Sequence, residues 1–347
     1  MMSFIDFYSG MHVTEHNLGL MQKEALEAGS RIKAQLTNNA DQVIALVEKI
    51  RQYNPTSVMV VGRGSSDHAG LFAKYLIEIE LGIPTLHAAP SVATLYNAQL
   101  KLDNVLVIAI SQSGQSPDIL SIMKMATDQK AMTLALVNDV TSPLAELSDH
   151  VLPLAVGEEL AIAATKSYLA TLACLLQLVA YWKADKELIQ AVDSIPVSLA
   201  KAVASKAILT AKDLKNIGHM IVIGRGFGFA VGMEVALKLK EVCAVQAEAF
   251  SSAEFLHGPV RIVSEHFKII DLHINDESAE VHSDQSKGLA QRGAEIIPLA
   301  PAMDSVHPRI EPLCMLQRFY LDLERAGRQL GFDPDHPEGL KKVTETI

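Results

Sequence analysis

Residues 105–116, VLVIAISQSGQS, decide the fold of this chain. A continuous apolar run is typical of a strand buried in a parallel sheet, and here it stops at hydroxyls and a glycine before the helix-like segment 118–126. The backbone N–H groups of such a turn and of the helix start carry partial positive charge. The turn 111–116 is therefore suited to bind a phosphate without a lysine. The alternative is a serine-rich turn that only caps the helix.

A second strand-and-turn motif occurs twice. Residues 58–64, VMVVGRG, recur as residues 220–226, MIVIGRG, which predicts two copies of one nucleotide- or sugar-phosphate-type unit. Each copy continues with helix-like segments and two further apolar strands. These strands are predicted at residues 105–110 and 133–137 in the first copy and at residues 267–274 and 295–299 in the second. Strands that alternate with helices predict an α/β fold with doubly wound parallel sheets.

In such sheets a ligand binds beyond the carboxyl ends of neighbouring strands, so residues 64–66 and 111–116 should face one crevice. The second copy has Asn275-Asp276-Glu277 in place of the serine-rich turn, and two carboxylates repel a phosphate. We therefore expect only the first copy to hold the ligand. A nucleotide cofactor is not expected, because the G-x-G-x-x-G spacing fails at Asp67 and no lysine is placed as in a P-loop.

Composition limits the classes of partner. The formal net charge is −10, so a nucleic acid or a membrane surface would be repelled on average. The three cysteines lie far apart in apolar surroundings and predict free buried thiols in a reducing, cytoplasmic compartment. No signal peptide is expected at the start, and the uncharged stretch 167–182 is too short to span a bilayer and predicts a buried helix, at a subunit contact. His12 and His16 lack further donors, so no metal site is expected.

Residues 229–245 are apolar almost all round, so the charges among them need a reason. Glu234, Lys238 and Glu241 lie on one stripe of the predicted helix, whereas Lys240 points elsewhere. His257 follows at a turn before Gly-Pro. A carboxylate that moves a proton between adjacent carbons, with an imidazole that opens a sugar ring, suits aldose–ketose interconversion. The alternatives are a surface ion pair and an inert capped histidine.

Several motifs occur in one order along nearly the whole chain from Met21. They are Gly64-Ser65-Ser66, Ser111-Gln112-Ser113-Gly114, Glu159 through Thr165-Lys166, Glu234-x-x-x-Lys238-x-x-Glu241, His257-Gly258-Pro259 and Pro337-x-x-Leu340-x-Lys342. Together they resemble the sugar isomerase (SIS) family, in particular the isomerase half of glucosamine-6-phosphate synthase. The resemblance implies two tandem SIS domains, each a flavodoxin-like doubly wound parallel sheet, in a homodimer whose active site is shared between subunits.

The resemblance also implies a role for each matching residue. Glu241 would shuttle the proton between C1 and C2, and Glu234 and Lys238 would orient Glu241 and tune its basicity. His257 of a neighbouring subunit would open the sugar ring. Lys342, with Lys341 as the alternative, would form the imine at the keto carbon and must be neutral when it attacks. The sugar phosphate would be held by Ser65, Ser66, Ser111, Gln112, Ser113 and Ser116, with Gly64, Glu159 and Ile162 as further substrate contacts.

Synthases of this type begin with a glutaminase domain, whereas Met1-Met2-Ser3 leads here almost directly into the isomerase portion. We therefore expect an isomerising deaminase that converts glucosamine-6-phosphate and water to fructose-6-phosphate and ammonia. One alternative is a deaminase or deglycase for another amino- or fructosamine-6-phosphate, since Ala164 replaces a serine that synthases usually place beside the substrate. A non-catalytic sugar-phosphate sensor is the other, although the first forty residues contain no basic helix-turn-helix segment.

The predicted organisation follows the repeat. It comprises an N-terminal helical arm (1–40), a phosphate-binding SIS domain (41–196), a second SIS domain with the catalytic helix and His loop (197–330) and a C-terminal tail (331–347). Prolines and glycines keep the tail from being helical for most of its length. It must wrap over the site if Lys342 is to act, the alternative being a frayed terminus.

Overall fold

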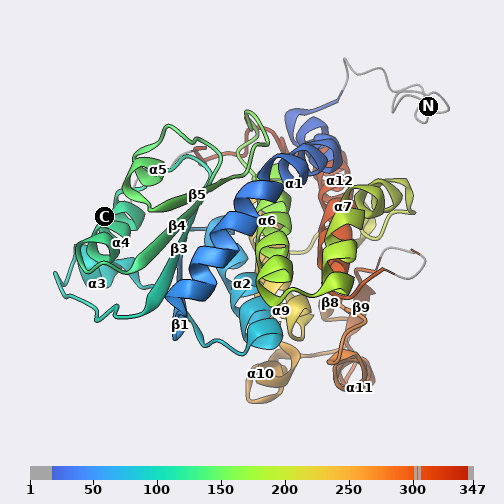
Figure 1. Cartoon of the computed structure of the whole chain (residues 1–347). Helices are drawn as coiled ribbons and strands as arrows, with labels where there is room; N and C mark the ends of the chain where they lie inside the picture. Colours follow the sequence, from blue (N-terminus) through green and yellow to red (C-terminus); the bar gives the residue numbers. More distant parts are fainter. Residues whose placement is uncertain (1–17, 301–302, 304–305, 343–347) are drawn as a thin grey trace.

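A computed structural model describes residues 18–300, 303 and 306–342 (Figure 1). In this part of the chain the strands form two sheets, both entirely parallel, with the orders β2-β1-β3-β4-β5 and β7-β6-β8-β9. The strands are β1 Ser57–Val61, β2 Thr85–His87, β3 Val105–Ser111, β4 Met132–Val137, β5 His150–Pro153, β6 His219–Gly224, β7 Gln246–Ser251, β8 Lys268–Leu272 and β9 Glu295–Pro298. The predicted α/β class with parallel sheets is confirmed.

The first sheet has the strand order of the flavodoxin-like fold, and β3 at its centre is buried along its whole length. The six strands predicted from apolar runs are present as β1, β3, β4, β6, β8 and β9. Strands β2, β5 and β7 were not predicted. They lie at the sheet edges, where partly exposed residues interrupt the apolar pattern.

Long helices fill the space between the two sheets (Figure 1). The layer contains α1 Leu20–Tyr53, α2 Ser65–Leu81, α6 Lys166–Lys183, α7 Lys186–Ala204, α9 Phe227–Cys243 and α12 Glu311–Gln329. Helix α6 packs against α1, α2 and α7 and is buried on nearly all sides within the chain. The buried helix predicted at residues 167–182 is confirmed. Its apolar surface is covered by helices of its own chain, so the expected subunit contact there is wrong.

The outer faces carry shorter elements. They are α3 Pro90–Thr94, α4 Pro117–Asp128, α5 Pro143–Leu147, α8 Ala211–Leu214, α10 Ser252–Leu256, α11 Ala279–Gln291 and a 3-10 turn at Pro259–Ile262. One hydrophobic cluster runs from α1 through the central helices to α12 and includes side chains of both sheets. Smaller clusters cover the outer face of each sheet. The two halves of the chain therefore share one core.

Two of the predicted boundaries fall inside helices. The division at residue 40 falls inside α1, and the division at residue 196 falls inside α7, which includes Pro196. Both helices keep their apolar faces through these positions because the shared core extends past them. Residues 1–17 of the predicted arm, which include His12 and His16, lie outside the described residues. The tail has neither helix nor strand over residues 331–342, as expected.

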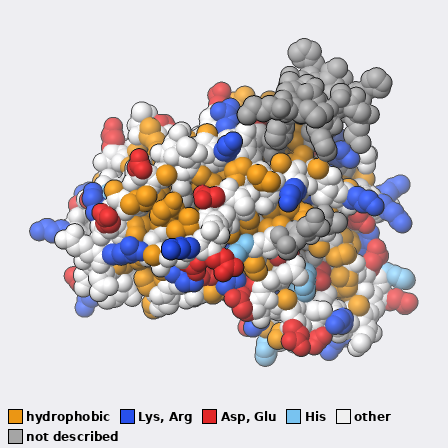
Figure 2. Space-filling view, turned by 45° about the vertical axis from the view of Figure 1, so that its right-hand side comes forward, with side chains coloured by type: hydrophobic (Ala, Val, Ile, Leu, Met, Phe, Trp, Pro, Cys, Tyr) orange, Lys and Arg blue, Asp and Glu red, His pale blue; other side chains and the backbone are white. Residues whose placement is uncertain are grey.

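The charged side chains, the cysteines and the apolar helices can each be compared with what the composition predicts. On the face in Figure 2, acidic and basic side chains are interspersed, with hydrophobic patches between them. The cysteines Cys174, Cys243 and Cys314 are free and buried, as expected. Burial raises the pKa of each thiol to about 12. Among residues 18–300, 303 and 306–342, no helix is long and apolar enough to cross a membrane.

Candidate active site

A cleft of about 900 Å³ opens at the carboxyl ends of β1 and β3. It lies where the strand order of the first sheet reverses, which is where parallel α/β sheets bind ligands. The structure brings twelve of the predicted site residues to its walls. These are Gly64, Ser65, Ser66, Ser111, Gln112, Ser113, Ser116, Glu159, Ile162, Lys238, Glu241 and Lys342.

The serine-rich turn is folded by its own hydroxyls. Gly114 donates its N–H to the Ser111 hydroxyl at 3.0 Å, and Gln115 donates to the Ser113 hydroxyl at 3.3 Å. Gly114 has a φ of 66°, and a Cβ there would lie 2.1 Å from Oγ of Ser142. The turn thus requires glycine and leads directly into α4, whose N-terminus favours an anion.

The repeated glycines let a helix start close to a strand end. A Cβ on Gly62 would lie 2.6 Å from the carbonyl carbon of Ser66, and one on Gly224 would lie 2.3 Å from that of Gly228. In each copy the helix therefore begins directly against the end of the first strand. This close approach is the physical reason for the repeat.

The Ser65 side chain has polar partners on α9. Its hydroxyl donates to Oε1 of Glu234 at 3.0 Å and accepts from Nζ of Lys238 at 3.2 Å. The side chain thus links α2 to the charged stripe of α9. Ser65 lines the cleft, but its hydroxyl is engaged in this network.

The charged stripe on α9 is a buried set of ion pairs. Nζ of Lys238 lies 2.5 Å from Oε2 of Glu241 and 3.3 Å from Oε1 of Glu234. Burial acts to raise the pKa of Glu234, but the charge of Lys238 and the hydrogen bonds from His68 and Ser65 outweigh it and hold the pKa below its usual value. Burial acts to lower the pKa of Lys238, and the two carboxylates outweigh it and raise the pKa. Lys240 bonds instead to the carbonyl of Ala247, so the predicted stripe is confirmed.

The C-terminal tail supplies a lysine to the cleft. Nζ of Lys342 donates to the carbonyl oxygen of Ala161 at 2.7 Å and to Oε2 of Glu159 at 3.1 Å. Glu159 is fully buried and also accepts from the Ser167 hydroxyl at 2.6 Å. Burial acts to raise the pKa of Glu159, and the charge of Lys342 with these hydrogen bonds lowers it overall. Lys341 lines the cleft too but is exposed, so Lys342 is the residue held at the site.

Two predicted residues do not line the cleft. Glu234 is fully buried behind Lys238 and Ser65 and reaches the cleft only through them. His257 is exposed at the C-terminal end of α10, a helix that packs against β7 of the second sheet. The chain by itself therefore does not bring His257 together with Glu241. Its contribution from a neighbouring subunit stays a prediction.

Several residues at the site were not predicted, and three of them hold or border its charged groups. His68 lies on α2 with Nδ1 3.0 Å from Oε2 of Glu234. Glu24 on α1 accepts from the backbone amides of Leu160 and Ala161 and so holds the loop that carries Glu159. Arg63 lines the cleft beside the serine-rich turn. Of these three, Arg63 had a signal in the sequence, because it lies inside the repeated Gly-Arg-Gly.

The corresponding turn of the second copy is closed by its own carboxylates. Asp276 accepts from the backbone and the hydroxyl of Ser278, at 2.8 and 2.6 Å. Glu277 pairs with Arg309 at 2.7 and 2.8 Å, and this hydrogen-bonded pair lowers the pKa of Glu277 to about 2. These negative groups lie where the first copy has its serines.

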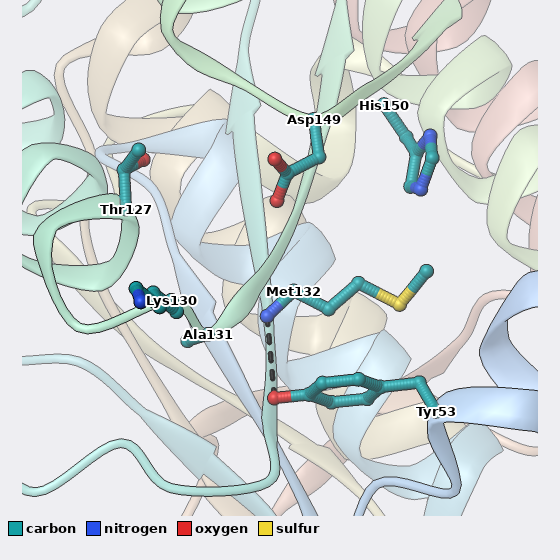
Figure 3. A pocket seen from close by; sticks show the side chains of 7 residues that line it. All are labelled: Tyr53, Thr127, Lys130, Ala131, Met132, Asp149 and His150. Carbon is teal, nitrogen blue, oxygen red and sulfur yellow. Dashed lines mark hydrogen bonds between the residues drawn. The ribbon is translucent and has the colours of Figure 1, made fainter.

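A second hollow, of about 530 Å³, lies at the opposite edge of the first sheet, where β4 and β5 begin (Figure 3). The Tyr53 hydroxyl accepts from the backbone N–H of Met132 at 3.3 Å and donates to the carbonyl of Val105 at 3.2 Å. Asp149 accepts from the backbone and the hydroxyl of Thr133. Tyr53 thus joins the end of α1 to the first residues of β3 and β4, and Asp149 joins the residue before β5 to β4. These contacts have a structural role.

The fold and the cleft place the chain among the parallel α/β proteins with a ligand cleft at the carboxyl ends of the strands. A model of the SIS domain matches residues 52–181, and the chain belongs to this family. It is 34% identical to a protein of Silicibacter pomeroyi provisionally named a phosphosugar isomerase. That alignment covers 92% of this chain and all of the other, with a TM-score of 0.86.

Curated relatives are longer. The chain is 31% identical over 342 residues to the isomerizing glutamine–fructose-6-phosphate aminotransferase of Methanothermobacter thermautotrophicus, with 93% of this chain and 56% of the relative covered. The chain thus spans about half the length of this relative. The fold is also shared with a glucosamine-6-phosphate deaminase of Thermotoga maritima, at 22% identity, with 94% of this chain and all of that chain covered and a TM-score of 0.77.

Proposed function

We propose that the protein is an isomerising deaminase of an aminosugar phosphate, and that it converts glucosamine-6-phosphate and water to fructose-6-phosphate and ammonia. One observation carries the proposal. The serine-rich turn, Glu241 of α9 and Lys342 of the tail, which are far apart in the sequence, line one cleft of about 900 Å³. A phosphate held at the turn would present the other end of a hexose to a carboxylate and an amine.

Binding would use dipoles and hydroxyls. The start of α4 attracts an anion, and Ser111, Gln112, Ser113 and Ser116 line the cleft beside it. Ser66 would contribute its hydroxyl from α2. Ile162 and the backbone at Gly64 would limit the position of the sugar.

Proton transfer would use Glu241. Its carboxylate is held 2.5 Å from the ammonium of Lys238, and it is partly open to the cleft, with 21% of the side chain exposed. As a base it would take the proton from C2 of the open-chain aminosugar and return it to C1, which converts the C2 amine to an imine. Lys238 and Glu234 would keep Glu241 oriented during this transfer. His257 of a neighbouring subunit would open the ring in a homodimer with a shared site.

Release of ammonia would use Lys342. Its neutral amine would add to C2 of the imine, ammonia would leave, and water would then hydrolyse the new lysine imine to the ketose. Atoms balance, because one water enters and one ammonia leaves. In the structure Nζ of Lys342 lies 3.1 Å from Oε2 of Glu159. Substrate must therefore displace this pair, and Glu159 could accept the lysine proton.

One observation leaves the sugar open. Ala164 lines the cleft, so the wall beside the substrate is small and apolar at this position and would fit another aminosugar or a fructosamine-6-phosphate. The buried free thiols suit a reducing compartment, and we place the activity in the cytoplasm.

The test is direct. Purified protein is incubated with glucosamine-6-phosphate, and ammonia and fructose-6-phosphate are measured together, with galactosamine-6-phosphate and fructosamine-6-phosphate as parallel substrates. We expect equal amounts of both products from glucosamine-6-phosphate and none from the Glu241→Gln variant. A sugar-phosphate sensor would bind these sugar phosphates without converting them. Absence of ammonia from all three substrates would refute the proposal.

A further inference from the structure

Arg63 connects the two turns that border the cleft. It follows β1 in the first Gly-Arg-Gly, and its Nε lies 2.5 Å from Oδ2 of Asp118 in the first turn of α4. The Asp118 side chain is fully buried, whereas 47% of the Arg63 side chain is exposed. Arg63 also lines the cleft together with Ser111, Ser113 and Ser116. The guanidinium is thus fixed at one end and open to the cleft.

A guanidinium has more donors than this ion pair can use. It carries five N–H groups in one plane, and a single carboxylate engages at most two of them. The others remain for a ligand beside the serine-rich turn. Arginine matches phosphate oxygens well because its donors are planar and its charge persists at any pH that the fold tolerates.

The second copy of the repeat offers a comparison within the same chain. Arg225 occupies the equivalent position, but it donates to the Ser251 hydroxyl at 3.3 Å. The neighbouring turn there carries the Asp276 carboxylate in place of serines, with Oδ2 of Asp276 3.6 Å from the position of a Cβ on Gly226. The two arginines share a backbone position and differ in their surroundings, so Arg225 is a matched control.

We propose that Arg63 is the cation that recognises the phosphate group of the substrate, oriented by its ion pair with Asp118. The inference rests on the proposed function in one respect, namely that the ligand of the cleft is a phosphorylated sugar. Arg63 would then set specificity for phosphorylated over free sugars. It would act mainly in binding, because the phosphate end of a hexose lies away from the carbons that react.

The experiment compares Arg63→Met, Arg63→Lys and Arg225→Met. Binding of inorganic phosphate is measured by calorimetry at two ionic strengths, and KM and kcat are measured with glucosamine-6-phosphate. A charged hydrogen-bonded contact contributes about 1.5–3 kcal/mol, so we expect Arg63→Met to weaken phosphate binding and raise KM by about 10- to 100-fold, with kcat within about threefold. Arg63→Lys should recover part of the affinity, because it keeps the charge and loses the planar donors.

Arg225→Met should bind phosphate like the parent protein, and thermal melting checks that each variant is folded. If Arg63→Met does not fold, Arg63→Lys still tests the inference, since phosphate affinity equal to that of the parent would overturn it. Equal affinity in a folded Arg63→Met variant would also overturn it. Phosphate binding does not depend on turnover. Loss of binding in a protein that releases no ammonia would therefore support the role of Arg63 while the deaminase proposal fails.

Discussion

Nδ1 of His68 lies 3.0 Å from Oε2 of Glu234, so a helix of the first sheet holds a fully buried carboxylate on the charged stripe of α9. The same carboxylate accepts from Ser65 and pairs with Lys238, which in turn pairs with Glu241. Because Glu234 is held ionised, Nδ1 of His68 must carry the proton in this contact. The proposed base is therefore positioned through a chain of contacts that crosses between the two halves of the molecule.

Replacing His68 should disturb both stability and catalysis. We expect His68→Ala to lower the free energy of unfolding by about 1–3 kcal/mol, because a buried carboxylate loses one donor. A misplaced Glu241 should also lower kcat by about tenfold, the equivalent of about 1.4 kcal/mol in the barrier. Urea unfolding and steady-state kinetics measure the two effects.

The conservative variant His68→Asn keeps a donor near the position of Nδ1 and should recover most of kcat. His87→Ala is the control, because the His87–Asp67 pair is partly exposed and lies outside the network. A His68→Ala enzyme with the kcat and the pH profile of the parent would contradict the positioning role.

Lys342 should be the residue that joins covalently to the sugar. We expect Lys342→Met to release ammonia at least about 1000-fold more slowly, because the variant lacks the amine that would form the imine. Lys341→Met should stay within about threefold, since Lys341 is exposed and Lys342 occupies the site. Borohydride added during turnover should reduce the imine, and mass spectrometry should find the sugar on Lys342. Modification of Lys341 instead would reverse the assignment.

The pKa shifts of two buried glutamates predict sensitivity to acid. Glu159 and Glu234 both have a pKa below the ordinary value of 4.5 in the folded chain. Their contribution to stability is thus fully present above the ordinary value and is lost as the pH falls through the folded values. We expect the urea midpoint to fall between pH 5 and pH 3, and to fall less in Glu159→Gln. If the urea midpoint falls equally with pH in the parent protein and in Glu159→Gln, Glu159 does not govern acid unfolding.

Much of this architecture could be predicted from the sequence. Strands β3 and β6 were visible because they are continuous apolar runs that end at glycine or serine. The stripe of α9 was visible because charges in an apolar helix need a partner. Edge strands such as β7 were missed, since half-exposed strands carry mixed sequences.

The site was only partly predictable for a related reason. A pattern along the chain shows which residues share an element, but it does not show which elements meet. Glu24 and His68 belong to ordinary-looking helical stretches, and their roles appear only where α1 and α2 pack against other parts of the chain. Their partners lie more than a hundred residues away, at Leu160, Ala161 and Glu234.

Arg309 should be the main polar tie between the two halves. It pairs with Glu80 of α2 at 2.6 Å and with Glu277 at 2.7 Å, and its guanidinium lies 5.2 Å from the ring centre of Phe227. Only 8% of the Glu80 side chain is exposed, against 75% for Glu277, so the two pairs should differ in strength. Glu80 also pairs with Lys183 at 2.7 Å, so Arg309→Ala leaves it one charged partner. We expect Arg309→Ala to lower the free energy of unfolding by about 1–3 kcal/mol, because a buried carboxylate loses one of its two charged donors.

Glu277→Gln is the matched control, since it removes the exposed carboxylate and keeps Arg309 paired with Glu80. A surface pair contributes about 0–1 kcal/mol, so this variant should unfold near the urea midpoint of the parent. The difference in unfolding free energy between Arg309→Ala and Glu277→Gln should persist in 1 M NaCl, because salt screens exposed ion pairs more than buried ones. If both variants lose the same stability, and salt removes the loss, then the contact between Arg309 and Glu80 does not join the halves and the shared hydrophobic core holds them without it.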